Sequence, residues 1–387
     1  MLYIIEKNGS KAMKEANIIS NQNVNDSRQA EVDFLKVFPL ILLPIIHVYE
    51  NLSVGKLDAA PHTFAEHILQ FFCGPTCAPA FMFAMGVGIV YSKNNTPDKL
   101  MKRGIKLFIG GYLLNALRSG ILSVIATILT GAFDLEDIKY LFLNMDIFHF
   151  AGLSFILMSI FLRYNITPLV MVGISLIMQL FGEVLAMQPE MTSSLRYLAG
   201  HLYKCTWYGC FPLFQWYIFP ACGILYGTIL KKVYSLGAWY KRLGICAATL
   251  LVCLTGTLII LDFDITSFYS LENDMFYNQN FLSSVFALLL ICVVLSVSHV
   301  ISVPLKGTLV MHFVKQMSIH LMDIYAISWL IIGAAFVIFE TFELPIIPFK
   351  WIIPVGCLIT LVTILIIRII ENIQQKLKSN KKTIFNL

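Results

Sequence analysis

The sequence predicts an all-α membrane protein, a bundle of about ten transmembrane helices. Hydrophobic residues make up 58% of the 387 residues, charged residues only 13%, and the mean hydropathy is +0.76. A soluble domain carries about 25% charged residues. Apolar runs long enough to cross a hydrocarbon layer of about 30 Å recur along the whole chain. Because backbone groups within a bilayer must be hydrogen-bonded inside their own segment, each run is predicted to be a helix.

The apolar runs are separated by polar or charged residues and divide the chain into three regions. The predicted regions are a polar extension over residues 1–32, a transmembrane domain over 33–371 and a basic tail over 372–387. The first thirty residues lack the apolar core and cleavage site of a signal peptide, so the first helix is expected to remain attached. The predicted helices lie near residues 34–54, 66–92, 104–130, 146–162, 166–187, 209–230, 243–262, 280–304, 318–340 and 350–370.

The distribution of positive charge predicts the orientation in the membrane. If the N-terminus is cytoplasmic, 22 of the 28 Lys and Arg residues fall on the cytoplasmic side. This bias follows the positive-inside rule and predicts that both termini are cytoplasmic. The net charge of +5 then reflects topology and anionic lipids, and does not indicate nucleic-acid binding. The exceptions are Lys56, Arg118, Lys139, Arg196, Lys204 and Lys350.

The first predicted helix carries ionisable residues along one face. His47 lies eleven positions after Lys36, so the two side chains are within roughly 20° of each other and about 16 Å apart along the axis. Asp33 lies about 40° to the other side, in reach of Lys36 at the i to i+3 spacing. Ionisable groups inside a membrane are costly unless they face a cavity or a partner. This alignment favours a polar path lined by Asp33, Lys36 and His47, although His47 could also mark the end of the hydrocarbon region.

Two further groups of polar residues stand at helix starts. Lys102, Arg103 and Lys106 share one side near the membrane surface and could bind phosphates or lipid headgroups. Asp146 and His149 lie on the predicted outer side near the level of His47, where they could bind an acceptor. Alternatively, the negative charge of Asp146 at a helix start could interact favourably with the helix dipole.

The nine cysteines lie mostly in apolar runs, and none has zinc-site spacing with histidine, so no metal site is predicted. Cys205 and Cys210 would form a disulfide if the exterior is oxidising, and otherwise act as small apolar residues.

Several segments together resemble the acyltransferase-3 family and the related heparan-α-glucosaminide N-acetyltransferase-like membrane proteins. Their order along the chain is more specific than any one of them. The segments are the D-x-x-K pattern ending at Lys36 with His47 eleven residues later, "FMFAMG", "RGIK" (103–106), "MDIFHFAGLSFILMSIF" (145–161), "FPLFQWYIFPACGILYG" (211–227) and "MSIHLMDIYAISWLIIG" (317–333).

The resemblance implies transfer of an acyl group, with acetyl favoured, from cytoplasmic acyl-CoA to a hydroxyl or amine of an envelope glycan or glycolipid. It implies that His47 is essential, that Lys36 supports it, and that Arg103 and Lys106 bind acyl-CoA. The family usually has arginine at the positions of Lys36 and Lys106. Lysine keeps the charge but loses the planar, bidentate geometry. Acyl-CoA is then a co-substrate, with no permanently bound cofactor, and the predicted location is the cell membrane.

The chemistry of acyl transfer independently requires a base such as histidine. A base must remove the proton of the acceptor, and a neutral imidazole suits this role near pH 7. We therefore expect His47 and the basic cluster to face one hydrated tunnel. A multi-pass transporter or flippase of a small polar or lipid-linked substrate, and a sensor or assembly subunit without catalysis, remain alternatives. No internal repeat of the transporter kind is visible.

Overall fold

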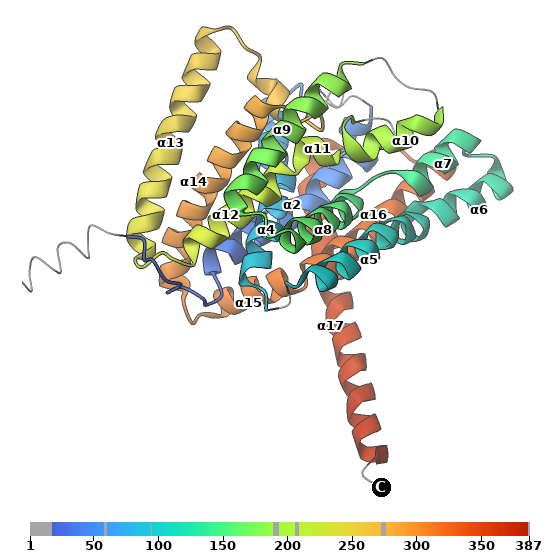
Figure 1. Ribbon diagram of the computed structural model, residues 1–387. Coiled ribbons are helices and arrows are strands. Elements are labelled where there is room, and N and C mark those ends of the chain that lie inside the picture. Colours follow the sequence, from blue (N-terminus) through green and yellow to red (C-terminus); the bar gives the residue numbers. More distant parts are fainter. Residues whose placement is uncertain are drawn as a thin grey trace, which may run out of the picture.

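The computed structural model describes residues 18–57, 60–93, 95–188, 193–205, 209–271 and 276–385. These residues form a helical bundle, with a long C-terminal helix that projects from it (Figure 1). Residues 1–17 of the predicted extension and the last two residues of the predicted tail lie outside the described ranges.

The helices follow one another with short connections. Their bounds are α2 Ala30–Leu52, α3 Phe64–Cys73, α4 Ala78–Tyr91, α5 Pro97–Asn115, α6 Ile121–Thr130, α7 Leu135–Leu143, α8 Ile147–Arg163, α9 Pro168–Ala186, α10 Ser193–Leu202, α11 Leu213–Trp216, α12 Ile218–Leu230, α13 Leu236–Ile260, α14 Phe281–Leu305, α15 Leu309–Ile319, α16 Leu321–Thr341 and α17 Ile352–Phe385.

The predicted fold class is confirmed. Among the described residues, nine helical segments are long and apolar enough to cross a membrane, and α8 is a shorter apolar helix. Two of the predicted single helices are interrupted. The run at 66–92 is divided into α3 and α4 at Gly74 and Pro75, and the run at 104–130 contains a π-helical segment, Ala116–Gly120, between α5 and α6. Which side of a membrane the termini face stays a prediction.

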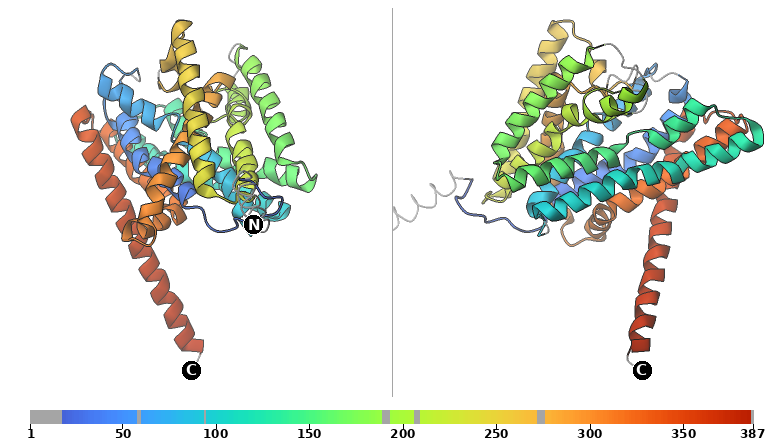
Figure 2. Two further views of the ribbon diagram at one scale, coloured as in Figure 1. Left: turned by 90° about the vertical axis from the view of Figure 1, so that its left-hand side faces the viewer. Right: turned by 45° about the vertical axis from the view of Figure 1, so that its right-hand side comes forward.

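Helix α2 is enclosed by the rest of the bundle. It packs against α4, α14, α15, α16 and α17 (Figures 1 and 2). Leu35, Leu40, Val48 and Tyr49 are almost completely buried along its length. Pro39 and Pro44 lie inside the helix, where each removes one backbone donor. The helix that carries Lys36 and His47 is therefore a central element, and its polar side chains face protein rather than lipid.

Close packing between α4 and α12 depends on two glycines. A Cβ atom on Gly86 would lie 2.1 Å from the carbonyl oxygen of Pro220, and one on Gly223 would lie 2.1 Å from that of Phe83. Small residues that let backbones touch are a common means of helix association in membranes. This crossing fixes α4, which forms a wall of both cavities described below.

The helix ends do not follow the predicted domain boundaries. Helix α2 begins at Ala30, and α17 continues through the predicted tail to Phe385. The described part of the N-terminal extension packs on the bundle, where the carbonyl oxygen of Ile18 accepts a 2.8 Å hydrogen bond from the amide of Tyr234. Ile18 itself is buried in the largest apolar cluster. The extension is thus part of the folded unit from residue 18 onward.

Candidate functional site

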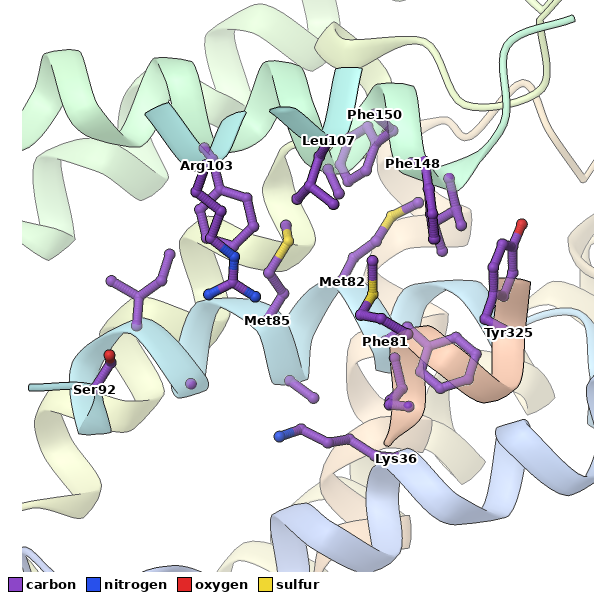
Figure 3. Close-up of a pocket in the computed structure, with 18 of the residues that line it drawn as sticks. Lys36, Phe81, Met82, Met85, Ser92, Arg103, Leu107, Phe148, Phe150 and Tyr325 are labelled. Atoms are coloured by element: carbon purple, nitrogen blue, oxygen red, sulfur yellow. The ribbon is translucent and has the colours of Figure 1, made fainter. Parts of the chain in front are cut away.

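Of the cavities that α2 lines, one contains Arg103 and another contains His47, near opposite ends of the helix. The first, which we call the Arg103 cavity, is formed by α2, α4, α5, α8, α15 and α16 and is shown in Figure 3. The second, the His47 cavity, is formed by α2, α3, α4, α16, the π-helical segment and the chain before α8. Phe81, Ile147 and Tyr325 line both cavities. The single hydrated tunnel expected from the sequence is therefore divided in this structure, and these three side chains form the division.

His47 is held by a carboxylate on its own helix. Its Nδ1 atom lies 2.7 Å from Oε2 of Glu50, one turn further along α2. The other oxygen of Glu50 accepts a hydrogen bond of 3.3 Å from the hydroxyl of Tyr277. A carboxylate accepts, so Nδ1 donates to Glu50, and in the neutral ring Nε2 then keeps its lone pair. The His47 side chain is 15% exposed, within reach of a molecule in the cavity.

Trp329 and Arg118 complete the surroundings of the imidazole. The Trp329 ring lies 4.1 Å from the His47 ring, measured between centroids. The guanidinium carbon of Arg118 lies 4.4 Å from the centre of the same indole. Aromatic faces attract cations, more strongly where water is excluded. Trp329 thus connects the buried arginine to the histidine.

Arg118 is neutralised by a buried carboxylate. Its Nη1 atom lies 2.8 Å from Oδ2 of Asp146, and both residues are less than 10% exposed. Oδ1 of Asp146 accepts a hydrogen bond from the Tyr325 hydroxyl. Arg118 comes from the π-helical segment, and such segments are frequent at functional sites because they redirect side chains. The pair brings one positive and one negative group into the wall of the His47 cavity.

The Arg103 cavity combines two cations with apolar walls. Lys36 and Arg103 both point into it from opposite sides (Figure 3). The guanidinium carbon of Arg103 lies 4.5 Å from the centre of the Phe155 ring. In the described part of the chain, no ion pair within 4 Å involves Lys36. Met82, Met85 and Leu107 line the space between these charges and Tyr325. Two cations without an ion pair among the described residues, beside apolar cavity walls, suit a ligand with an anionic head and a long, thin remainder.

Several residues predicted for the site lie elsewhere. The carboxylate of Asp33 binds Arg28, at 2.7 and 2.8 Å, and accepts a bond from Ser318, so the expected pairing with Lys36 is wrong. Lys102, Arg103 and Lys106 are all exposed, but only Arg103 lines the Arg103 cavity. A helix turns about 100° per residue, which places Arg103 alone of the three toward the cavity.

The other predicted pair is divided as well. Asp146 lines the His47 cavity, whereas His149 does not. The Nδ1 atom of His149 accepts the backbone hydrogen bond of Asp146, and its ring packs on Tyr112 at 4.2 Å. Gly111 leaves room for this ring, since a Cβ atom there would lie 2.6 Å from it. His149 caps its helix and closes the core, which is a structural role.

The described residues contain no group of three or more His, Cys, Asp or Glu side chains able to hold a metal ion. All nine cysteines are free, including Cys205 and Cys210, which do not form the disulfide considered from the sequence. Glu50, Arg118, Tyr325 and Trp329 were not assigned to the site from the sequence. Glu50 had a local signal, the i to i+3 spacing from His47, and Arg118 had one as a charged residue inside the predicted run at 104–130. Arg118, Tyr325 and Trp329 meet His47 through tertiary packing.

One of three comparisons with known proteins gives a match, and it covers the part of the chain that carries His47 and Arg103. The family model described as heparan-alpha-glucosaminide N-acetyltransferase, catalytic, matches residues 28–257, more than half of the chain. Neither a search of curated proteins nor a search of solved structures returned a match. The matched region contains Lys36, His47, Glu50, Arg103 and Arg118, while α16, with Tyr325 and Trp329, lies beyond it.

Proposed function

Because the chain belongs to the heparan-alpha-glucosaminide N-acetyltransferase catalytic family, we propose that it transfers an acyl group, acetyl in the simplest case, from acyl-CoA to a hydroxyl or amine. The acceptor we propose is a glycan or glycolipid of the cell envelope. The chain is a multi-pass membrane protein by its nine candidate spans. The family supports the reaction class, and the donor, acceptor and membrane are parts of the proposal.

The observation that carries this proposal is the His47–Glu50 pair in the wall of a cavity. At a distance of 2.7 Å, Glu50 fixes the Nδ1-protonated tautomer of His47. The free Nε2 atom can then act as a general base, with the carboxylate stabilising the imidazolium that forms. Tyr277 holds the second oxygen of Glu50, so the carboxylate is itself oriented.

The reaction that we propose needs only one proton carrier. Nε2 of His47 removes the proton from the acceptor hydroxyl or amine as the acceptor attacks the thioester carbonyl. A carbon–oxygen or carbon–nitrogen bond forms, the carbon–sulfur bond breaks, and the proton passes from His47 to the departing thiolate. Arg118 supplies positive charge in the same cavity, which favours the negative charge that develops on the carbonyl oxygen.

We propose that the donor is anchored in the Arg103 cavity. Lys36 and Arg103 bind phosphate oxygens of CoA, because charged hydrogen bonds to phosphate are short and strong. The thin arm that carries the thioester follows the apolar channel beside Met82 and Met85 toward His47. The axial rise from Lys36 to His47, about 16 Å on an α-helix, suits an extended molecule rather than a compact one.

Asp146 is proposed to act on the acceptor side. Its carboxylate lines the His47 cavity and carries no other ion pair among the described residues than that with Arg118. A carboxylate can accept a hydrogen bond from a sugar hydroxyl or from an ammonium group. The family description names a glucosaminide, so an amino sugar is the first acceptor to test.

The proposal is tested with purified protein in detergent, using acetyl-CoA with a radiolabelled acetyl group and a methyl glucosaminide or a glycolipid extract as acceptor. Transfer of label is expected from the wild type, and a loss of about 10²-fold or more from His47→Gln. Mass spectra of envelope glycans from cells with and without the protein should differ by acetyl groups. A transporter would move its substrate across closed vesicles but would not transfer label in detergent.

A further inference from the structure

One of the three side chains that separate the two cavities is held by a hydrogen bond. Tyr325 on α16 lines both cavities and is only 4% exposed. Its ring stacks on Phe148, with centroids 5.1 Å apart and planes at 27°. In Figure 3, Phe81 and Tyr325 lie at the end of the Arg103 cavity that is farthest from Ser92 and Arg103. Phe81 and Ile147 are apolar, so Tyr325 alone of the three is fixed by a side-chain hydrogen bond, to Asp146.

We propose that Tyr325 is a positioning residue that closes the passage between the cavities and links its opening to Asp146. This inference rests on the proposed function, since it concerns the path of the donor. The cations that would hold the donor and the base that would act on it lie on opposite sides of the division. A thioester anchored at Arg103 can reach His47 only if the division opens.

The hydrogen bond of Tyr325 links the residue that closes the passage to Asp146, the proposed acceptor-binding residue. Asp146 uses Oδ2 for Arg118, while its Oδ1 accepts hydrogen bonds from the Tyr325 hydroxyl and from the backbone amide of Ile147. When the Tyr325 ring moves aside, Oδ1 keeps the Ile147 amide but loses its side-chain donor within the His47 cavity. Losing a hydrogen bond to a buried carboxylate is costly, so a hydroxyl or ammonium group of the acceptor is favoured as the replacement for Tyr325. Arrival of the donor thereby prepares the site of the acceptor.

The closed position has a second consequence. While Tyr325 seals the passage, the base in the His47 cavity cannot activate a water molecule for attack on a thioester in the Arg103 cavity. Keeping a reactive group away from activated water protects it from hydrolysis. Removal of the ring should therefore raise acyl-CoA hydrolysis relative to transfer, whereas a residue that only stabilises the fold would lower both together.

The first test compares Tyr325→Ala and Tyr325→Phe with the control Tyr217→Phe. Tyr217 is also buried, lies outside both cavities, and its hydroxyl has no hydrogen-bond partner in the described part of the chain. CoA release from acetyl-CoA is measured with and without methyl glucosaminide. We expect Tyr325→Ala to raise the ratio of hydrolysis to transfer at least about tenfold, a change of about 1.4 kcal/mol in relative barriers. Tyr325→Phe, which keeps the ring but not the hydrogen bond, should mainly lower the KM of the acceptor, because Oδ1 of Asp146 then lacks its Tyr325 donor. An unchanged ratio in Tyr325→Ala would overturn the proposal.

The second test does not depend on catalysis. Cys73 and Cys77 line the His47 cavity but not the Arg103 cavity. In sealed proteoliposomes, an anionic methanethiosulfonate is applied to the face onto which the Arg103 cavity opens, and modification of Cys77 is followed by mass spectrometry. Tyr325→Ala should speed this modification about tenfold or more over the wild type and Tyr217→Phe, with Cys222 as an internal reference.

The two tests separate the two proposals. Faster Cys77 modification without any acyl transfer in the wild type would reject the enzyme function but keep Tyr325 as the closing residue. Acyl transfer with no change at Cys77 in Tyr325→Ala would reject the role of Tyr325 alone. If Tyr325→Ala does not fold, Tyr325→Leu removes the hydrogen bond and most of the ring while retaining apolar volume, and the same outcomes apply.

Discussion

The Nδ1 atom of His47 lies 2.7 Å from Oε2 of Glu50, and both side chains project from adjacent turns of the enclosed helix α2. Local geometry of the helix alone is enough to bring the two groups together, because residues three apart share a face. What the tertiary structure adds is the cavity in front of the imidazole and the Trp329 ring beside it. The pair therefore gives the histidine a defined tautomer inside the bundle.

The role of Glu50 leads to the first prediction. Glu50→Gln keeps the shape of the side chain but removes the charge that stabilises the imidazolium and allows the wrong tautomer of His47. The transfer rate is expected to fall about 10²-fold to 10⁴-fold, with little change in the KM of acyl-CoA. The control is Glu183→Gln, a carboxylate on α9 whose oxygen accepts the backbone hydrogen bond of Phe281, outside both cavities. Equal activity of Glu50→Gln and the wild type would contradict the assignment.

The second prediction concerns the anchor of the donor. Arg103→Ala should raise the KM of acyl-CoA about 10-fold to 100-fold, which corresponds to the loss of about 1.5–3 kcal/mol from charged hydrogen bonds. Arg103→Lys should have a smaller effect, because lysine keeps the charge without the planar fork. Lys106→Ala, at an exposed position outside the cavity, is expected to change the KM less than Arg103→Ala. Initial rates at varied acetyl-CoA concentrations give the KM of each variant.

The matched control for charge removal is Arg242→Ala on the exposed surface of α13, a helix that lines neither cavity. The KM of acyl-CoA should stay at the wild-type value in this variant. A larger KM effect in Lys106→Ala than in Arg103→Ala would place the donor on the outer surface of α5 instead of in the cavity.

A third prediction follows from the buried pair of Arg118 and Asp146. Replacing one member leaves the other charged and unpaired, which costs about 3–5 kcal/mol. Arg118→Met and Asp146→Leu should therefore each lower the melting temperature of the detergent-solubilised protein clearly. The double variant should recover most of the loss in stability without recovering activity. Additive losses in the double variant would show that the two residues do not stabilise each other.

The fourth prediction is a pH dependence of stability that arises outside the candidate spans. In α10, burial lowers the pKa of His201 from its usual value of 6.5. Nε2 of the neutral ring accepts a 2.8 Å hydrogen bond from the Tyr112 hydroxyl, while Nδ1 donates to the carbonyl oxygen of Tyr197. Because the folded state disfavours protonation, the contribution of His201 is complete above pH 6.5 and is lost as the pH falls below it.

Thermal unfolding in detergent should therefore show a drop in the melting temperature between pH 7 and acidic pH that is smaller in His201→Gln. The glutamine variant can still hydrogen-bond Tyr112 but cannot take up a proton. An identical pH dependence in both proteins would mean that His201 does not contribute to it.

The sequence was sufficient for the class of fold because hydropathy reports directly on membrane burial. It also predicted Lys36 and His47 as site residues, since an ionisable residue within an apolar run must face a cavity or a partner. Arg103 was predicted from the basic cluster at a helix start and from the family resemblance. At the start of the third predicted helix, helical spacing did not predict which of the basic residues lines the cavity. Lys102 and Lys106 share the charge of Arg103, but only Arg103 faces the cavity, and that depends on the packing of α5 against α8.

Long-range partners could not be predicted from the sequence. Asp33 was expected to pair with Lys36 but forms its ion pair with Arg28. Arg28 lies just before the start of α2, outside the apolar run from which the helix was predicted. Trp329 and Tyr325 are separated from His47 by most of the chain and have no local signal. The division of the expected tunnel is likewise made by α2's neighbours α4, α8 and α16, whose approach is set by the whole bundle.

The most direct test of the account is the rate of acetyl transfer from acetyl-CoA to a methyl glucosaminide by purified His47→Gln protein, compared with the wild type at equal amounts of folded protein. The account predicts that the wild type transfers acetyl groups in detergent and that the His47→Gln rate is lower by about 10²-fold or more. Wild-type rates in the His47→Gln protein would contradict it.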